Sequence, residues 1–145
     1  MGVYTRFKRG PEGFRALVEL LESTPPGRRQ KMIDAGMMED PEFTDKALLA
    51  MFTFEDIKIL PDVEMAELVA AAPPRVIAIA IHAESEETKT RFIRNAKAPI
   101  GAEIRDFSAT SYGPSETVGA QLRLVTTARK LEQQGKIKSK RLLPK

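Results

Sequence analysis

Apolar residues recur along this chain at the three- and four-residue spacing of amphipathic helices. The first stripe follows Gly10-Pro11 and consists of Phe14, Leu17, Val18 and Leu21. Its i, i+3, i+4, i+7 pattern places the four side chains on one helix face, and proline fits the first turn of a helix. We therefore predict a helix that begins near residue 10 and turns this face towards other helices.

Proline punctuation predicts two more helices before residue 51. Thr24 precedes Pro25-Pro26 and Asp40 precedes Pro41, which is the order of an N-cap residue followed by proline at the first helical position. The third helix would carry Phe43 on its apolar face. Three short amphipathic helices cannot each enclose a core, so we expect them to stack as in an armadillo-type solenoid.

The stretch 51–57 looks like a joint between two helical blocks. Thr53 can cap a new helix, and the two acids that follow Phe54 would lie in its first turn, where the helix dipole favours negative charge. Phe52 and Phe54 supply an apolar anchor on either side of Thr53. We expect a packed joint here and not a flexible linker.

Beyond the joint, the segment 76–81 reads Val-Ile-Ala-Ile-Ala-Ile, which favours a strand on propensity alone. No partner strand is evident elsewhere in the sequence, and a lone strand cannot satisfy its own backbone groups, so we predict a buried helix that is apolar on all sides. Ser85 is predicted to cap the next helix, and the longest helix should run from Pro114 to a stop at Gly135. The predicted fold class is all-α.

The basic excess lies at the two ends of the chain. The net charge is +3 at pH 7, and eight cations lie before residue 11 or after Gly135: Arg6, Lys8, Arg9, Lys136, Lys138, Lys140, Arg141 and Lys145. Removing those eight from +3 leaves −5 on the rest of the chain. Aromatic residues are not interleaved with the basic tail, so solvated ends explain the charge better than nucleic-acid binding does. We expect no nucleic-acid partner.

The sequence offers little catalytic or metal-binding chemistry. It has no cysteine and one histidine, His82, which excludes a transition-metal site of ordinary ligand number. A triad of His82, Ser111 and Asp106 can be written down, but nothing in the spacing favours it. No apolar run approaches the roughly 20 residues of a membrane helix. We expect no enzymatic activity, no cofactor, no metal and no direct membrane insertion.

Several segments resemble the C-terminal half of the flagellar motor switch protein family FliG. The likeness covers roughly residues 11 to 137. Its most specific parts are Glu-Asp-Pro-Glu at 39–42, Met-Phe-x-Phe with Glu-Asp-Ile at 51–57, Ser-x-Glu-x-Lys at 85–89, Gly-Pro at 113–114 and Leu-Glu-x-x-Gly at 131–135. The resemblance implies that 76–81 is helical, because this segment aligns with helices of the family.

The resemblance also implies a domain organisation within an armadillo-like helical superhelix. The parts would be a basic N-terminal segment, a three-helix armadillo-like module, a hinge, a six-helix torque domain and a basic tail, at 1–10, 11–50, 51–54, 55–135 and 136–145. The hinge would comprise Met51, Phe52, Thr53 and Phe54. The family's N-terminal and middle modules have no counterpart in these residues, which fits either a piece of a longer protein or a naturally shortened relative.

The function implied by the resemblance is that of a rotor protein, which transmits stator force to the cytoplasmic ring and takes part in switching the direction of rotation. Its partners would be other motor switch proteins (FliM-like) and the cytoplasmic loop of the stator (MotA-like). It would lie in the cytoplasm, peripheral at the inner face of the bacterial inner membrane. The face made by Phe14, Leu17, Val18 and Leu21 would lack its stacking partner, the family's middle module, so we expect self-association into a ring or dimer there.

In the family, torque depends on a ridge of charged residues, and the chain departs from that pattern. His82 stands where the ridge has its first lysine, Asp106 retains one of two acids with Arg105 before it, and Phe107 replaces the second acid. The ridge arginines are also missing, with Pro99 or Ala98 at one position and Ser115 and Glu116 at the other.

The stator-facing ridge expected from the resemblance is therefore reduced to His82, Arg105 and Asp106, and any further charge would come from Arg91 or Arg94. The loss favours an alternative function. The chain would then be a FliG-like paralogue that generates no torque and acts as a helical scaffold in a motility or secretion assembly.

Overall fold

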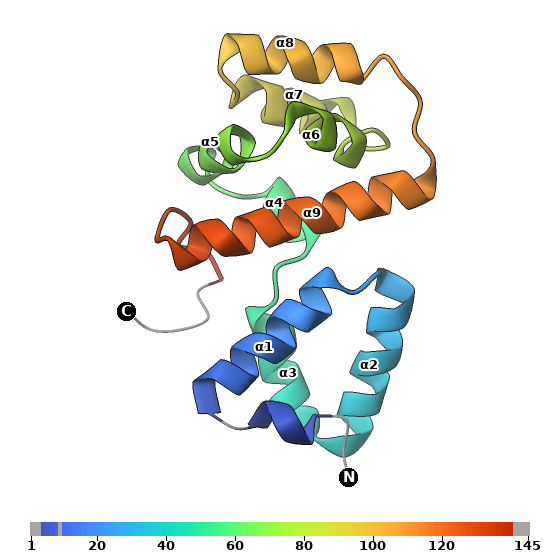
Figure 1. The fold of residues 1–145 in the computed structure, drawn as a ribbon, viewed down its shortest axis with the longest axis vertical. Helices are drawn as coiled ribbons and strands as arrows, with labels where there is room; N and C mark the ends of the chain where they lie inside the picture. The colour runs from blue at the N-terminus through green and yellow to red at the C-terminus, as the bar shows by residue number, and fades with distance from the viewer. Residues whose placement is uncertain (1–3, 9, 141–145) are drawn as a thin grey trace. The chain divides into compact units, whose positions relative to one another are not determined.

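The structure, a computed structural model, describes residues 4–8 and 10–140 of the chain (Figure 1). These residues form one short 3-10 helix and α-helices with no strand, which confirms the all-α prediction. They divide into two compact units between Phe52 and Thr53: unit 1 contains the described residues up to Phe52 together with Lys140, and unit 2 runs from Thr53 to Ser139.

Unit 1 is built from η1 and three α-helices: η1 (Thr5–Lys8), α1 (Gly10–Ser23), α2 (Pro26–Glu39) and α3 (Pro41–Ala50). Its core consists of Tyr4, Phe7, Leu17, Val18, Leu21, Ala47 and Met51. Tyr4 lies against α2, where its hydroxyl donates to the carbonyl of Met32 (2.8 Å) and its ring takes the space that a side chain at Gly36 would need. The N-terminal residues were expected to be a separate basic segment, but Tyr4 and Phe7 belong to the core because their rings cover α1, α2 and α3.

Of the two caps predicted in unit 1, the one at Asp40 is confirmed and the one at Thr24 is wrong. Asp40 caps α3 as expected, since its carboxylate accepts from the Phe43 amide (3.2 Å). The predicted cap at Thr24 is wrong: the N-cap of α2 is Pro25, and the Thr24 hydroxyl instead donates to the Leu20 carbonyl in the last turn of α1 (2.6 Å). That bond satisfies a carbonyl that the end of α1 leaves without a helical partner.

Unit 2 consists of α4 (Phe54–Lys58), α5 (Asp62–Ala71), α6 (Pro74–Ala80), α7 (Glu86–Arg94), α8 (Ala98–Phe107) and α9 (Pro114–Gln133). The segment 76–81 does form a helix, α6, as predicted, and its residues from Val76 to Ala80 are all buried. It packs against α8 and α9 (Figure 1), whereas Arg75 in its first turn is exposed. Burial among other helices suits the apolar composition of residues 76–81.

The ends of the unit 2 helices follow ordinary capping rules. The Ser85 hydroxyl accepts from the Thr88 amide at the start of α7 (3.2 Å), as predicted. At the end of α9, Gly135 has a φ of +78°, a left-handed conformation that glycine adopts without strain. The amides of Gly135 and Lys136 then donate to the Glu132 and Leu131 carbonyls, which is a Schellman motif.

This turn directs the chain back over unit 2, so the expected tail is partly structural. Ile137 is fully buried. Glu64 of α5 accepts from the Lys138 amide (3.1 Å) and the Ser139 hydroxyl (2.8 Å). The boundary predicted at residue 135 is therefore too early, because unit 2 extends to Ser139.

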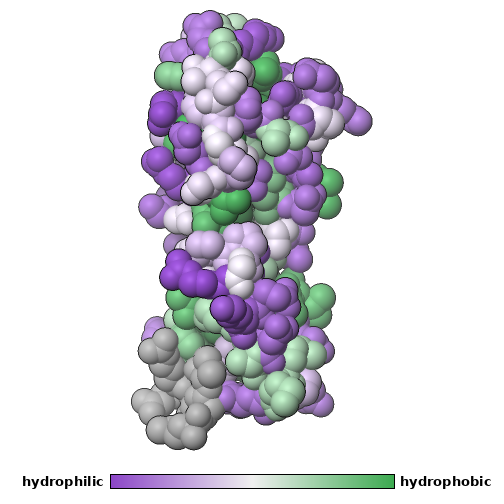
Figure 2. Space-filling view, turned by 90° about the vertical axis from the view of Figure 1, so that its right-hand side faces the viewer, coloured by the Kyte–Doolittle hydropathy of each residue, from purple (hydrophilic) through white to green (hydrophobic). Residues whose placement is uncertain are grey.

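Charged and polar side chains make up most of the surface. Figure 2 shows one face on which hydrophilic residues surround smaller hydrophobic areas. The large apolar side chains that are most exposed are Met38, Leu49, Ile59 and Val63. Within residues 4–8 and 10–140, none of the helices combines the length and apolar character needed to cross a membrane.

Candidate functional site: the joint, the α4–α7 clasp and the α7–α8 groove

The segment 51–54 is held at both of its ends. Met51 ends α3 and lies in the core of unit 1, and the Phe52 amide donates to the buried carboxylate of Glu22 (2.7 Å). Thr53 starts α4 with a capping box, in which its hydroxyl accepts from the Asp56 amide (3.3 Å) and its own amide donates to the Asp56 carboxylate (2.9 Å). The predicted Thr53 cap is therefore confirmed. The boundary between the units falls at the one peptide bond between these two anchors.

Helix α4 is fastened to α7 by a group of contacts that we call the α4–α7 clasp, made by Phe54, Lys58, Glu84, Arg91 and Phe92. The rings of Phe54 and Phe92 stack with centroids 6.3 Å apart and planes 18° from parallel. The Arg91 guanidinium donates to the carbonyls of Lys58 (2.7 Å) and Leu60. These carbonyls lie at the end of α4, where no helical amide is available to them.

Lys58 adds an ion-pair bridge to the clasp. Its ammonium group lies 2.8 Å from a carboxylate oxygen of Glu55 and 2.9 Å from one of Glu84, which immediately precedes α7's cap residue. Hydrogen bonds to Glu55 and then to Glu84 raise the pKa of Lys58 above its ordinary value. The lysine is therefore charged throughout the physiological pH range and links α4 to the start of α7.

The structure places the expected ridge residues in different surroundings. His82 follows α6, is half-buried and meets the Tyr112 ring edge-on at a centroid distance of 5.5 Å. The Tyr112 hydroxyl in turn donates to the carbonyl of Phe107 at the end of α8 (2.8 Å). Arg105 and Asp106 are exposed on α8, and neighbouring helical residues point about 100° apart. The histidine is thus a packed ring, whereas the two charges face solvent in different directions.

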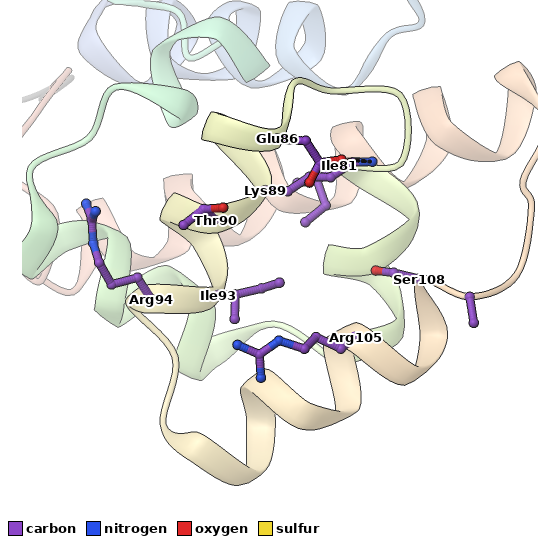
Figure 3. A pocket seen from close by; sticks show the side chains of 9 residues that line it. Ile81, Glu86, Lys89, Thr90, Ile93, Arg94, Arg105 and Ser108 are labelled. Carbon is purple, nitrogen blue, oxygen red and sulfur yellow. Dashed lines mark ion pairs between the residues drawn. The ribbon is translucent and has the colours of Figure 1, made fainter.

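A groove separates α7 from α8 and has a volume of about 710 Å³. We call it the α7–α8 groove; it is lined by Ile81, Glu86, Lys89, Thr90, Ile93, Arg94, Arg105, Ser108 and Ala109. Figure 3 shows Ile93 of α7 projecting into it and Arg105 reaching across from α8 towards α7. Asp106 and His82 do not line the groove, so Arg105 alone connects it with the expected ridge.

The prediction that Phe14, Leu17, Val18 and Leu21 form an open assembly face is wrong. Leu17, Val18 and Leu21 have no exposed surface, and Phe14 is partly buried and packs against the same core. The face is closed because η1 and α3 both contact α1 within unit 1. The residues predicted for self-association therefore stabilise unit 1 from inside.

Arg91 is the residue whose role the sequence did not reveal. From the sequence, Arg91 was only a candidate for an additional charge on the ridge. In the structure, its guanidinium donates hydrogen bonds to carbonyls more than thirty positions earlier in the chain. The sequence signal was weak: a basic residue in the last turn of a helix is also what the helix dipole favours. Among the described residues, no group of three His, Cys, Asp or Glu side chains is arranged to hold a metal ion.

The fold and the joint define an all-α, armadillo-like helical protein. A solved structure of FliG residues 86–343 from H. pylori has the same fold, with a TM-score of 0.65 at 17% sequence identity over 87% of this chain and 60% of that one. The full-length FliG structure from Aquifex aeolicus aligns with a TM-score of 0.54 at 28% identity, over 85% of this chain and 39% of that one.

The chain belongs to the FliG C-terminal domain family, whose model matches residues 37–138. It is 31% identical over 130 residues to the flagellar motor switch protein FliG of Aquifex aeolicus, and 27% identical over 128 residues to that of Thermotoga maritima. These alignments cover 87% and 86% of this chain but 39% and 38% of the relatives. The chain thus spans about two fifths of the length of the curated relatives that it matches.

Proposed function

We propose that this chain is a rotor component of a bacterial flagellar motor, which receives force from a stator and passes it to the cytoplasmic ring. The observation that carries the proposal is the α4–α7 clasp, together with membership of the FliG C-terminal domain family. A force-transmitting part must connect the surface that receives the force to the segment that delivers it without yielding between them.

The connection runs through unit 2 in three steps. Arg105 and Asp106 lie on α8, which contacts α7. Helix α7 holds α4 through the stacked Phe54 and Phe92 rings and through Arg91. Helix α4 begins at Phe54, and its N-cap Thr53 is the first residue after the boundary between the units. A displacement of α8 would therefore reach the joint through packed helices and charged hydrogen bonds.

In this proposal Met51, Phe52, Thr53 and Phe54 form the hinge. The Phe52 backbone is anchored to Glu22 of unit 1, and Thr53 and Phe54 are anchored within unit 2. Two anchors on adjacent residues leave rotation about the backbone between Phe52 and Thr53 as the available movement, which is how hinges confine a change to a few dihedral angles. Such a hinge would let unit 2 reorient when the direction of rotation switches.

The partners in this proposal are a stator cytoplasmic loop (MotA-like) and other motor switch proteins (FliM-like), with the chain in the cytoplasm at the inner face of the bacterial inner membrane. Neighbouring copies would associate in a ring. Charged contacts across water contribute only about 0 to 1 kcal/mol each, so a stator surface needs several of them acting together.

A second candidate function is a helical scaffold that generates no torque. The observation that favours it is the state of the ridge: His82 packs against Tyr112, and the apolar Phe107 is 37% exposed on α8. A ridge reduced to Arg105 and Asp106 carries opposite charges that partly cancel at a distance.

One experiment separates the two functions. This chain replaces the matching region of a flagellar motor switch protein in a motile bacterium, and rotation of tethered cells is measured together with assembly of flagella. If the chain is a rotor component, the flagella should rotate, and His82→Lys combined with Phe107→Asp should increase torque. If the chain is a scaffold, the flagella should assemble but not rotate. Thr126→Asp, an exposed position on α9, is the matched control for added charge. Failure to assemble flagella would contradict both functions.

A further inference from the structure

The cations of the α7–α8 groove are weakly engaged within the protein. Within residues 4–8 and 10–140, the side chain of Arg105 makes no hydrogen bond or ion pair. Arg94 lies 3.9 Å from Asp62, and both side chains are more than 60% exposed. Lys89 lies 3.7 Å from Glu86, whose side chain is 91% exposed. Exposed pairs at such distances contribute little, so these three cations remain available to a ligand.

Two isoleucines also line the groove. Ile81 is 1% exposed, and Ile93 projects from α7 between the charged residues (Figure 3). The groove has a volume of about 710 Å³. An apolar side chain that contacted the two isoleucines there would be removed from water together with them, which is favourable. The volume lies in the range of ordinary ligand sites, so it accommodates a few side chains of a peptide and not a whole helix bundle.

We propose that the α7–α8 groove docks an acidic segment of a partner protein, which places one apolar side chain against Ile93 and pairs its carboxylates with Arg105 and Arg94. Arginine suits this role because its planar guanidinium binds a carboxylate through two parallel hydrogen bonds. An amphipathic helix in a groove supplies such a pattern, with an apolar anchor and acids one turn away on either side. With three cations against Glu86, the groove favours an acidic partner over a basic one.

This inference rests on the proposed function only through Arg105, which belongs to both surfaces. Lys89 lines the groove and is not among the expected ridge residues, whereas Arg94 lines the groove and was named above as a possible further ridge charge. His82 and Asp106 are expected ridge residues outside the groove. The two surfaces can therefore be tested separately. Variants at Lys89 report on the groove alone, and variants at Asp106 report on the ridge alone.

The test is a titration of the full chain with a synthetic helical peptide of leucine and glutamate at i, i+3 and i+4 spacing, followed by amide chemical shifts. We expect saturable shifts confined to α7 and α8, and loss of binding in high salt because the contact is charged. Arg105→Glu and Arg94→Glu should each weaken binding at least tenfold. Arg123→Glu, an exposed residue of α9 outside the groove, makes the same charge change and should weaken it less than twofold.

Two further peptides complete the design: one with glutamine in place of glutamate and one with alanine in place of leucine. Each should bind at least tenfold more weakly, since one removes the carboxylates and the other the apolar anchor. No binding of the acidic peptide, equal binding of all three peptides, or an equal effect of Arg123→Glu would overturn the proposal. If the Asp106→Lys variant binds the peptide normally but does not rotate in the tethered-cell assay, the groove and the ridge act independently. If the peptide binds while the graft assembles without rotating, the proposed motor function fails and the groove stands.

Discussion

Replacing Arg91 by leucine should destabilise unit 2 by about 2 to 4 kcal/mol, because the guanidinium caps carbonyls that no other group reaches in the described structure. A hydrogen bond to a charged group contributes about 1.5 to 3 kcal/mol, and a buried acceptor left without a partner costs about 1 to 3 kcal/mol. Leu60, one of the two residues whose carbonyl is involved, is only 2% exposed. The ion pair with Asp62 adds little, since that carboxylate is 66% exposed.

The assay is native-state hydrogen exchange of the α4 and α7 amides, which follows unit 2 without assuming that the whole chain unfolds in one step. Arg94→Leu is the matched control, since it removes an arginine from the same helix that makes only a long ion pair, 3.9 Å from Asp62. Asp62→Asn isolates the ion pair and should cost less than about 1 kcal/mol. A loss below about 1 kcal/mol for Arg91→Leu, or an equal loss for Arg94→Leu, would refute the account of the clasp.

Three other predictions concern the two units. Gly36→Ala should cost about 1 to 3 kcal/mol in thermal unfolding, because the new Cβ would lie 2.3 Å from the Tyr4 ring, whereas Gly119→Ala in α9, where nothing lies within 4 Å, should gain about 0.5 to 1 kcal/mol. A hydrogen bond from Lys8 and then one from the Phe43 amide lower the pKa of Asp40. The contribution of Asp40 to stability is therefore present above its ordinary pKa of 3.8 and is lost as the pH falls through the folded-state pKa. In a series of unfolding curves at different pH, Asp40→Asn should reduce this loss of stability at acid pH. Phe54→Ala should cost about 1.5 to 2.5 kcal/mol in the same exchange assay, roughly half the range for a fully buried ring, because the Phe54 ring is only partly buried. A cost under about 0.5 kcal/mol would show that the stack contributes nothing.

The features that sequence patterns predicted correctly are those decided by neighbouring residues. The caps at Asp40, Thr53 and Ser85 each depend on a side chain and an amide three positions later, so the local sequence contains all of the information. The helix at 76–81 required more, since its β-branched residues favour a strand and only the surrounding helices override that preference.

The features that were missed depend on contacts between distant segments. The Arg91 bonds join residues more than thirty positions apart, and the α7–α8 groove exists only once two helices have packed. The expected assembly face failed for a related reason: the stripe at Leu17 and Leu21 showed which face is apolar, but not that Tyr4 and Phe7 would cover it. Periodicity identifies a face to be buried and does not identify its partner.

The uniformly apolar segment 76–81, most of which forms α6, has a consequence for the newly made chain. Its core partner α9 is synthesised later. Until α9 has been made, the six residues from Val76 to Ile81 remain exposed to water and keep their preference for extended structure. Stretches that are apolar, β-branched, uncharged and free of proline are those that assemble into intermolecular sheets. Pro73 and Pro74 on one side and the acids beginning at Glu84 on the other interrupt such pairing, as gatekeeper residues do around aggregation-prone segments. The prolines therefore serve nascent-chain solubility as well as helix initiation.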